Sequence, residues 1–318
     1  MIEINKPLNY ISERLRLEQP LGKPIIRTIE PTNACMMNCV MCPRKFMKRK
    51  VEFMNLEFFE SIIDQAKWNK GLDFSQFGDP LMHPQLDKMI EYCENKNIKT
   101  IIAINPNLLT EKNIIKILKA GISSIGISID GLNDEQYKFY RGQNADYELA
   151  KKNVKSLLKI KKQMKSVVEI HISGILNNVL KGNFDKFKKI WNEVGVKNVQ
   201  PVGYKAFDGS IKEIFKYGKI HKKFKYHCSE PWVGVSVVAS GKVVPCCYDY
   251  DEKCILGDLK KQTLLEVWYG EPMRRLRKEF IEKNVKNILC VNCMNRQEIN
   301  LGSIIFSKIR KRIWETRK

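Results

Sequence analysis

The chain has 318 residues, 43% of them hydrophobic and 29% charged, which is enough for two globular domains and excludes a disordered chain or a membrane bundle. No uncharged apolar run approaches the length of a membrane-spanning helix, and no signal peptide precedes the first element, so we expect a cytoplasmic protein. Lysine and arginine total 56 against 35 acidic residues, but they are spread along the chain, which indicates a solvated surface or a small anionic substrate rather than nucleic acid.

Strand-like and helix-like periodicities alternate about six times between residues 24 and 205, after an N-terminal extension over residues 1–23. Strands are predicted at 24–29, 72–77, 99–104, 124–129, 166–172 and 198–202. Helices are predicted at 56–67, 84–95, 110–120, 147–159 and 183–194. Repeated βα units build a parallel sheet, and six units fall short of the eight in a closed barrel. The predicted fold class is therefore α/β, with an open, partial (β/α)6 barrel over residues 24–205.

The texture of the sequence changes after residue 205. Residues 206–227 are predicted to form a basic connector, and residues 228–300 a small C-terminal α+β module. In this module, strands at 233–239 and 242–244 flank a Ser240-Gly241 turn, and short helices follow at 264–269 and 273–283. Residues 301–318 are predicted to form a basic helix that docks on the module, with peripheral membrane contact as the alternative.

Ten cysteines stand out in a chain expected in a reducing compartment, where they are more often metal ligands than disulfides. Cys35, Cys39 and Cys42 form a C-x3-C-x2-C pattern on one short loop after the first predicted strand. Three thiolates leave the fourth iron of a four-iron cluster without a protein ligand, so that position is open to a substrate or cofactor. A zinc site that borrows a distant fourth ligand is the alternative.

The remaining cysteines gather mainly in the C-terminal module. Four thiolates from three segments of that module can close either a zinc site or an iron–sulfur site. The six cysteines of the module are Cys228, Cys246, Cys247, Cys254, Cys290 and Cys293. Cys93 has the apolar spacing of its predicted helix and is expected in the core.

The C-x3-C-x2-C loop after the first strand resembles that of the radical S-adenosylmethionine (SAM) superfamily, which has a partial (β/α)6 barrel. The resemblance implies a [4Fe–4S] cluster at Cys35, Cys39 and Cys42 whose open iron binds SAM. It also implies reductive cleavage of SAM to a 5′-deoxyadenosyl radical, which abstracts a hydrogen atom from the substrate. A flavodoxin- or ferredoxin-type protein is the implied reductant.

Further family motifs lie where predicted strands end, and the resemblance implies that they contact SAM. These residues are Gly78, Asp79, Pro80, Ser128, Asp130 and Ser173. Phe77 and Asp79 depart from the usual Gly-Gly-Glu-Pro motif, which here is Phe-Gly-Asp-Pro. Arg141 is expected either to pair with a carboxylate of SAM or substrate or to lie on the surface.

The C-terminal module resembles the SPASM/twitch extension of radical SAM enzymes, through Pro231-Trp232, the turn after Ser240, Leu256–Leu259 and the final Cys-x-x-Cys. No cysteine follows Cys293, so the shorter twitch form with one auxiliary [4Fe–4S] cluster is expected. The implied ligands are Cys228, Cys246, Cys290 and Cys293. Cys247 and Cys254 remain: one of them replaces Cys246 as a ligand, donates a hydrogen atom to a substrate radical, or is simply buried.

Among radical SAM enzymes, the resemblance favours dehydrogenases and epimerases of carbohydrate-type small molecules, including aminocyclitols. Maturation of a ribosomally made peptide is the alternative, disfavoured because only 23 residues precede the first predicted strand. A non-catalytic metal-binding, nucleic-acid-associated protein is a remote alternative. Lys205 and Asp208 face the substrate or form a plain turn, and the four histidines (His83, His171, His221 and His227) are expected to be structural.

Overall fold

One continuous nine-stranded sheet organises the computed structural model, which describes residues 5–218, 228–291 and 293. The strands are β1 (Ile25–Ile29), β2 (Gly71–Asp73), β3 (Lys99–Ile104), β4 (Ser124–Ser128), β5 (Glu169–Ile175), β6 (Val199–Val202), β7 (Gly234–Val237), β8 (Lys242–Val244) and β9 (Gly257–Asp258). Their order is β6-β5-β4-β3-β2-β1-β7-β8-β9. Strands β1 to β6 run parallel, so the predicted α/β fold with a parallel sheet is confirmed.

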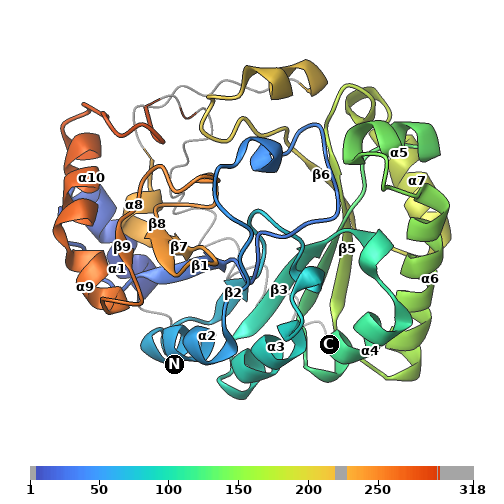
Figure 1. Ribbon diagram of the computed structural model, residues 1–318, viewed down its shortest axis with the longest axis horizontal. Helices are drawn as coiled ribbons and strands as arrows, with labels where there is room; N and C mark the ends of the chain where they lie inside the picture. The colour runs from blue at the N-terminus through green and yellow to red at the C-terminus, as the bar shows by residue number, and fades with distance from the viewer. Residues whose placement is uncertain (1–4, 219–227, 292, 294–318) are drawn as a thin grey trace.

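The helices of the barrel half lie along one side of this curved sheet (Figure 1). They are α2 (Leu56–Gln65), α3 (Leu86–Asn95), α4 (Glu111–Lys119), α5 (Asp134–Arg141), α6 (Tyr147–Gln163) and α7 (Phe184–Val194). Side chains of Asn55, Thr110, Asn133 and Asp146 cap α2, α4, α5 and α6 by accepting a hydrogen bond from a backbone N–H of the first turn. Local polar residues therefore set where these helices begin.

Strand β3 shows how the sheet divides its two faces. Thr100, Ile102 and Ile104 are buried on the face covered by helices, whereas the residues between them are exposed. Ile101 remains 39% exposed although it belongs to a central strand. The sheet register places Thr28, Asp73 and Ile101 side by side on that second face, which is the inner face of the open barrel.

The C-terminal hairpin is part of the same sheet rather than a separate layer. Strand β7 pairs in parallel with β1, and β8 and β9 follow in antiparallel order. Three short helices pack beside them: α8 (Glu230–Val233), α9 (Leu264–Tyr269) and α10 (Glu271–Ile281). The C-terminal module, called the auxiliary module below, is thus joined to the barrel by the pairing of β7 with β1.

Three helices of the described residues, α1, α5 and the one-turn α8, were not predicted from periodicity. In α1 (Asn5–Arg14) the buried positions are Asn9, Ser12 and Glu13, so the helix has no apolar stripe to detect. In α5 only Tyr137 and Tyr140 are buried. Strand β2 is also shorter than the predicted 72–77, because the chain turns at Ser75, where the Asp73 carboxylate accepts a backbone hydrogen bond.

The N-terminal extension is bound into the C-terminal module. The indole N–H groups of Trp232 and Trp268 donate to the carbonyls of Leu17 and Gly22 at 2.8 and 3.0 Å. The buried guanidinium of Arg277 donates to the Glu18 carbonyl at 2.9 Å. Residues close to the start of the chain therefore complete the core of a module that lies more than 200 residues later.

No helix in the described part of the chain is long and apolar enough to cross a bilayer. The basic helix predicted at 301–318, and its proposed membrane contact, lie outside the described residues, as do His221 and His227.

Candidate functional site

The three-cysteine loop follows β1, and its conformation is fixed from the far side of the barrel. Cys35, Cys39 and Cys42 are all partly exposed. The Val40 N–H donates to the Tyr140 carbonyl at 3.0 Å, and the Asn144 side chain donates to the Met36 carbonyl at 2.9 Å. Helix α5 and the turn after it thus brace a loop that lies more than 100 residues earlier in the chain.

The donor set of this loop fits an iron–sulfur cluster. Burial raises the pKa of all three thiols, that of Cys42 to about 12, so they need the charge of a metal to become thiolates. Within the described residues, no three His, Cys, Asp or Glu side chains stand close enough to hold a single metal ion. Ligands of a four-iron cluster stand farther apart than those of one ion, so this finding is compatible with a cluster at the loop.

The Phe77–Pro80 segment lies against the backbone just before the cysteine loop. A Cβ on Gly78 would lie 2.1 Å from the Thr32 carbonyl oxygen, so only glycine allows this approach. The Asp79 N–H donates to the Ala34 carbonyl at 2.8 Å. The Asp79 carboxylate accepts hydrogen bonds from two backbone N–H groups, and burial raises its pKa to about 6. Asp79 therefore orients its own segment through its side chain.

A buried ion pair lies beside Cys39. Arg141 Nη2 lies 2.5 Å from Asp130 Oδ2, while Asp130 Oδ1 accepts the Ile175 N–H at 2.7 Å. Arg141 Nη1 also donates to Cys39 Sγ at 3.9 Å. The side chain of Arg141 is 14% exposed, so it does not lie free on the surface, and the carboxylate that it pairs with is that of Asp130. Both oxygens of Asp130 are engaged by the protein itself.

The predicted serines lie next to each other at the carboxyl ends of adjacent strands. Ser128 of β4 and Ser173 of β5 are direct partners in the sheet register, and both are partly exposed. Parallel strands present their carboxyl ends at one edge, where such barrels bind ligands. Contacts of these serines with SAM remain a prediction.

A cavity of about 190 Å³ brings together the cysteines of the C-terminal module. All four implied ligands line it, and so does one further thiol: Cys228, Cys246, Cys247, Cys290 and Cys293. Thr28 of β1 and Asp73 of β2 form part of the wall, so the cavity adjoins the inner face of the barrel. Thiols from three segments converging on one cavity fit a cluster held by this module.

Cys254 is not among the residues that line this cavity. It is buried, and its Sγ accepts a hydrogen bond from Asn287 Nδ2 at 2.9 Å. Cys247, in contrast, lies on the cavity wall, where burial raises the pKa of its thiol to about 11. The two leftover cysteines thus have different surroundings, and Cys93 is fully buried in the core as expected.

Aromatic side chains fill the space between the Phe77 segment and the five-cysteine cavity. The ring of Phe77 lies 5.8 Å from that of Phe207 and 6.1 Å from that of Tyr250. Phe207 in turn lies 6.0 Å from Tyr248, which lines the cavity. Phe77, the departure from the usual glycine, thus belongs to a small hydrophobic cluster that includes Phe207 and Tyr250.

The polar residues expected near the substrate occupy well-defined positions. The Asp208 side chain is 2% exposed and pairs with Lys253 Nζ at 2.5 Å. The same Lys253 Nζ also donates to the hydroxyls of Ser210 and Tyr250. Lys205 Nζ lies 6.0 Å from the centre of the Tyr248 ring. Asp208 therefore joins the loop after β6 to the C-terminal module.

The two described histidines play different parts. His83 Nε2 lies 2.9 Å from the Met54 carbonyl, and its Nδ1 accepts the Gln85 N–H, so both ring nitrogens serve the fold. His171 lies on β5, and its ring covers Gly126 of β4, where a Cβ would come within 2.7 Å of Nε2. His171 shares the inner barrel face with Ala103 through the sheet register.

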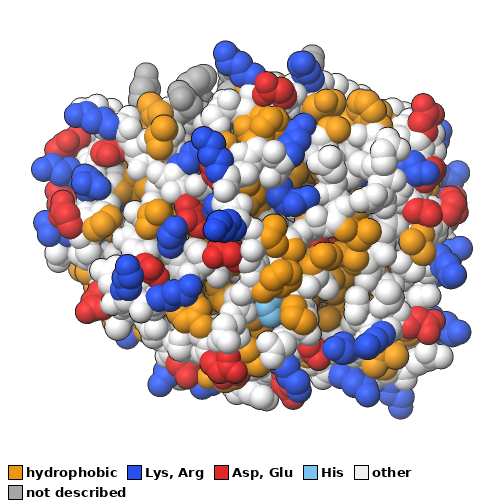
Figure 2. Space-filling model, in the orientation of Figure 1, with side chains coloured by type: hydrophobic (Ala, Val, Ile, Leu, Met, Phe, Trp, Pro, Cys, Tyr) orange, Lys and Arg blue, Asp and Glu red, His pale blue; other side chains and the backbone are white. Residues whose placement is uncertain are grey.

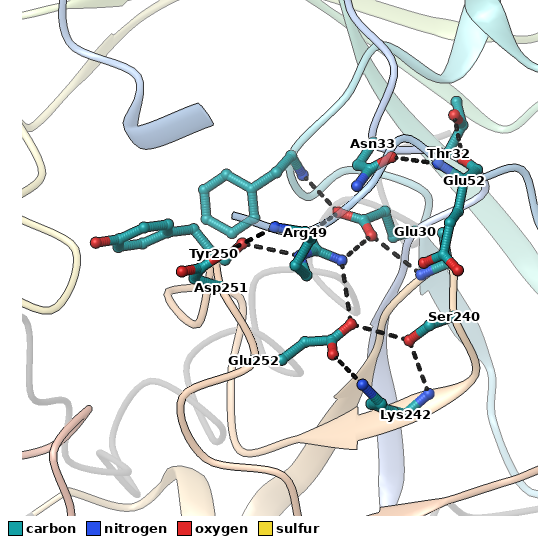
Figure 3. Close-up of polar contacts among 12 residues, drawn as sticks. Glu30, Thr32, Asn33, Arg49, Glu52, Ser240, Lys242, Tyr250, Asp251 and Glu252 are labelled. Atoms are coloured by element: carbon teal, nitrogen blue, oxygen red, sulfur yellow. Dashed lines mark hydrogen bonds and ion pairs between the residues drawn. The ribbon is translucent and has the colours of Figure 1, made fainter. Parts of the chain in front are cut away.

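Sequence reasoning missed a buried polar group at the end of β1. Glu30 is 0% exposed and forms a two-point ion pair with Arg49, at 2.8 and 2.9 Å (Figure 3). A lone glutamate after a strand carries no spacing signal, and its partners come from three distant segments.

Basic side chains are scattered over the face shown in Figure 2 and alternate with acidic and apolar ones. On that face they form no stripe of the kind that tracks a nucleic-acid backbone.

Comparisons with known proteins give two family matches. A model of the radical SAM superfamily matches residues 29–178, and an iron–sulfur cluster-binding domain model, SPASM, matches residues 228–316. The tungsten-containing aldehyde ferredoxin oxidoreductase cofactor-modifying protein of Pyrococcus furiosus is 24% identical over 315 residues, covering 84% of this chain and 86% of that protein.

Two further similarities differ in the substrates that their names state. The S-adenosyl-L-methionine-dependent 2-deoxy-scyllo-inosamine dehydrogenase of Niallia circulans is 23% identical over 276 residues, covering 84% of this chain and 91% of the relative. SuiB of Streptococcus suis, solved bound to precursor peptide SuiA, has a TM-score of 0.63 at 16% identity, covering 82% of this chain and 68% of SuiB. At that identity the structural likeness bears on the fold alone.

Proposed function

Because the chain belongs to the radical SAM superfamily and carries a SPASM iron–sulfur cluster-binding domain, we propose that it oxidises or epimerises a carbohydrate-type small molecule. When bound, SAM and its cluster, reduced by one electron from an external reductant, would supply a 5′-deoxyadenosyl radical, and the auxiliary cluster would supply an acceptor for a second electron.

The proposed ligands are divided between two places in one sheet. Cys35, Cys39 and Cys42 hold the SAM cluster after β1. Cys228, Cys246, Cys290 and Cys293 hold the auxiliary cluster in the five-cysteine cavity. The Gly78 segment, the two serines and the Asp130–Arg141 pair form the SAM site at the carboxyl edge of the strands.

The observation that carries the proposal is the wall of the five-cysteine cavity. Thr28 and Asp73, from the inner face of the barrel, line it together with the five cysteines. A group in this cavity therefore lies against the barrel, where a one-electron acceptor for a substrate radical is needed. The near full-length similarity to an aminocyclitol dehydrogenase supports the same assignment.

Oxidation and epimerisation make different demands on the protein. Oxidation of a secondary alcohol removes a hydrogen atom, one further electron and the hydroxyl proton. Epimerisation returns a hydrogen atom, which requires a thiol near the substrate. Cys247 lines the cavity and Cys254 does not, so Cys247 is the thiol that we propose for the second reaction.

A peptide substrate is the second candidate. It is supported by the fold shared with SuiB, whose structure contains a precursor peptide. The two candidates differ in what must occupy the barrel: a compact ring molecule or an extended chain.

The test is anaerobic reconstitution followed by SAM cleavage with dithionite in the presence of substrate panels. The panels contain aminocyclitols, sugars and nucleotide sugars deuterated at carbon, and a set of deuterated peptides. The proposal expects about eight irons per chain from two four-iron clusters, and deuterium in 5′-deoxyadenosine with the first panel. Deuterium transfer with peptides alone would replace the proposal by the second candidate, and about four irons would remove the electron-acceptor role.

A further inference from the structure

One buried carboxylate lies where three parts of the molecule meet. Glu30 directly follows β1, and its side chain accepts four hydrogen bonds (Figure 3). Oε1 accepts from Arg49 Nη2 at 2.9 Å and from the Phe77 N–H at 3.2 Å. Oε2 accepts from Arg49 Nη1 at 2.8 Å and from the Ala239 N–H at 3.0 Å.

The donors come from three functional segments. Arg49 follows Cys42 and anchors the downstream end of the three-cysteine loop. Phe77 directly precedes Gly78 and begins the segment proposed to contact SAM. Ala239 lies in the turn between β7 and β8, in the C-terminal module. The Glu30 carboxylate is therefore bonded at once to the cluster loop, to the SAM segment and to the auxiliary module.

Glu30 and its three donors, Arg49, Phe77 and Ala239, form a joint between these segments. Arg49 extends this joint toward the cysteines of the auxiliary module. Its Nε donates to the Tyr250 carbonyl at 2.9 Å, and Nη1 lies 3.7 Å from Glu252. Asp251 Oδ1 accepts the backbone N–H groups of Lys48 and Arg49 at 2.6 and 3.2 Å. The residues following Cys42 are thus bonded to residues that follow Cys247.

The geometry of the joint is better suited to alignment than to stability. A buried ion pair gains little net stability, because desolvation offsets its attraction. A two-point arginine–carboxylate pair is directional, however, and fixes the orientation of both partners. Removing one partner leaves a buried charge without compensation, so the pair holds its arrangement firmly.

We propose that Glu30 is a positioning residue: its carboxylate fixes the cluster loop, the SAM segment and the auxiliary module in one mutual arrangement. The part of this inference that concerns radical chemistry rests on the proposed function, whereas the mechanical joint does not. Loss of the carboxylate charge separates the three segments without removing any cluster ligand.

The test is Glu30→Gln in the anaerobically reconstituted protein, with amide hydrogen exchange as the first readout. We expect unchanged iron and sulfide, and exchange about tenfold faster at Phe77 and Ala239, whose N–H groups lose a charged acceptor. The second readout is SAM itself, with weaker binding in equilibrium dialysis and an altered electron paramagnetic resonance spectrum of the reduced, SAM-bound cluster. Glu148→Gln removes an exposed ion pair on α6 and is the matched control.

Arg49→Lys keeps the charge but loses the two-point contact, and it serves if Glu30→Gln does not fold. In this variant the exchange at residues 48–49 and 250–252 rises and SAM binding weakens to a smaller degree. The inference is overturned if the altered exchange is confined to one segment, or if SAM affinity and the spectrum match the unmodified protein in the variant that folds. Hydrogen exchange reads the joint directly, so failure of the substrate panels leaves this result interpretable.

Discussion

Gly78→Ala tests whether the approach of two backbone segments shapes the SAM site. The added Cβ would lie 2.1 Å from the Thr32 carbonyl oxygen and 2.8 Å from Asn33 Cα. Neither atom belongs to a flexible side chain, so the Phe77–Pro80 segment must move away from residues 32–34 by about 1 Å. Overpacking of this kind costs about 1–3 kcal/mol of folding free energy.

The displacement also acts on the chemistry, because residues 32–34 lead directly into Cys35. A misplacement of about 1 Å costs up to about 100-fold in rate, so we expect SAM cleavage to fall by about 10- to 100-fold. Urea denaturation gives the loss of stability, and 5′-deoxyadenosine formation gives the loss of rate. Iron content should stay unchanged, because the variant removes no ligand.

Gly203→Ala is the matched control, since nothing lies within 4 Å of a Cβ at that position. It should leave both measurements at the level of the unmodified protein. The argument from backbone contact fails if Gly78→Ala behaves like Gly203→Ala, or if it loses stability while SAM cleavage is retained in full.

Cys246→Ala should lose about half of the iron and Cys247→Ala should keep it, because Cys246 is the proposed ligand; the reverse result would exchange their roles. Glu230→Gln should move the potential of the auxiliary cluster to more positive values in a redox titration, since it removes a partly buried negative charge, paired with Arg27, beside the cysteine cavity; a negative shift would contradict this. Arg277→Met should cost about 2–4 kcal/mol and expose the N-terminal extension to limited proteolysis, because three backbone carbonyls lose their donor; resistance equal to that of the unmodified protein would refute the anchoring role.

Local spacing accounts for most of the fold that the sequence predicts. The residues of β3 alternate regularly, and α4 starts at a polar cap and has its apolar side chains on one face, so both are recognisable within about ten residues. Helix α1 escapes the same reasoning because its buried face consists of Asn9, Ser12 and Glu13. These side chains are held by partners elsewhere in the fold, such as the Lys23 and Val233 carbonyls that accept from Asn9.

The candidate site divides along the same line. The proposed cysteine ligands could be predicted because their spacing along short stretches of chain reflects the size of the cluster that they would hold. A site at the five-cysteine cavity could also be anticipated, since its cysteines lie singly or close together in three short segments of the sequence. What the spacing does not contain is the choice between Cys246 and Cys247, because both adjacent thiols line the same cavity.

Charged residues are the hardest to place from sequence, because their usual position is the surface. The sequence leaves Arg141 open between the surface and a carboxylate partner and gives no signal for Glu30. In the structure Glu30 is buried and Arg141 partly buried, and both are engaged by groups from other segments. Arg141 joins the end of β4 to Cys39, and Glu30 joins the end of β1 to Ala239, 209 residues later. Cysteine spacing therefore predicts the groups proposed to perform the chemistry, whereas their alignment depends on shielded charges whose partners only the folded chain supplies.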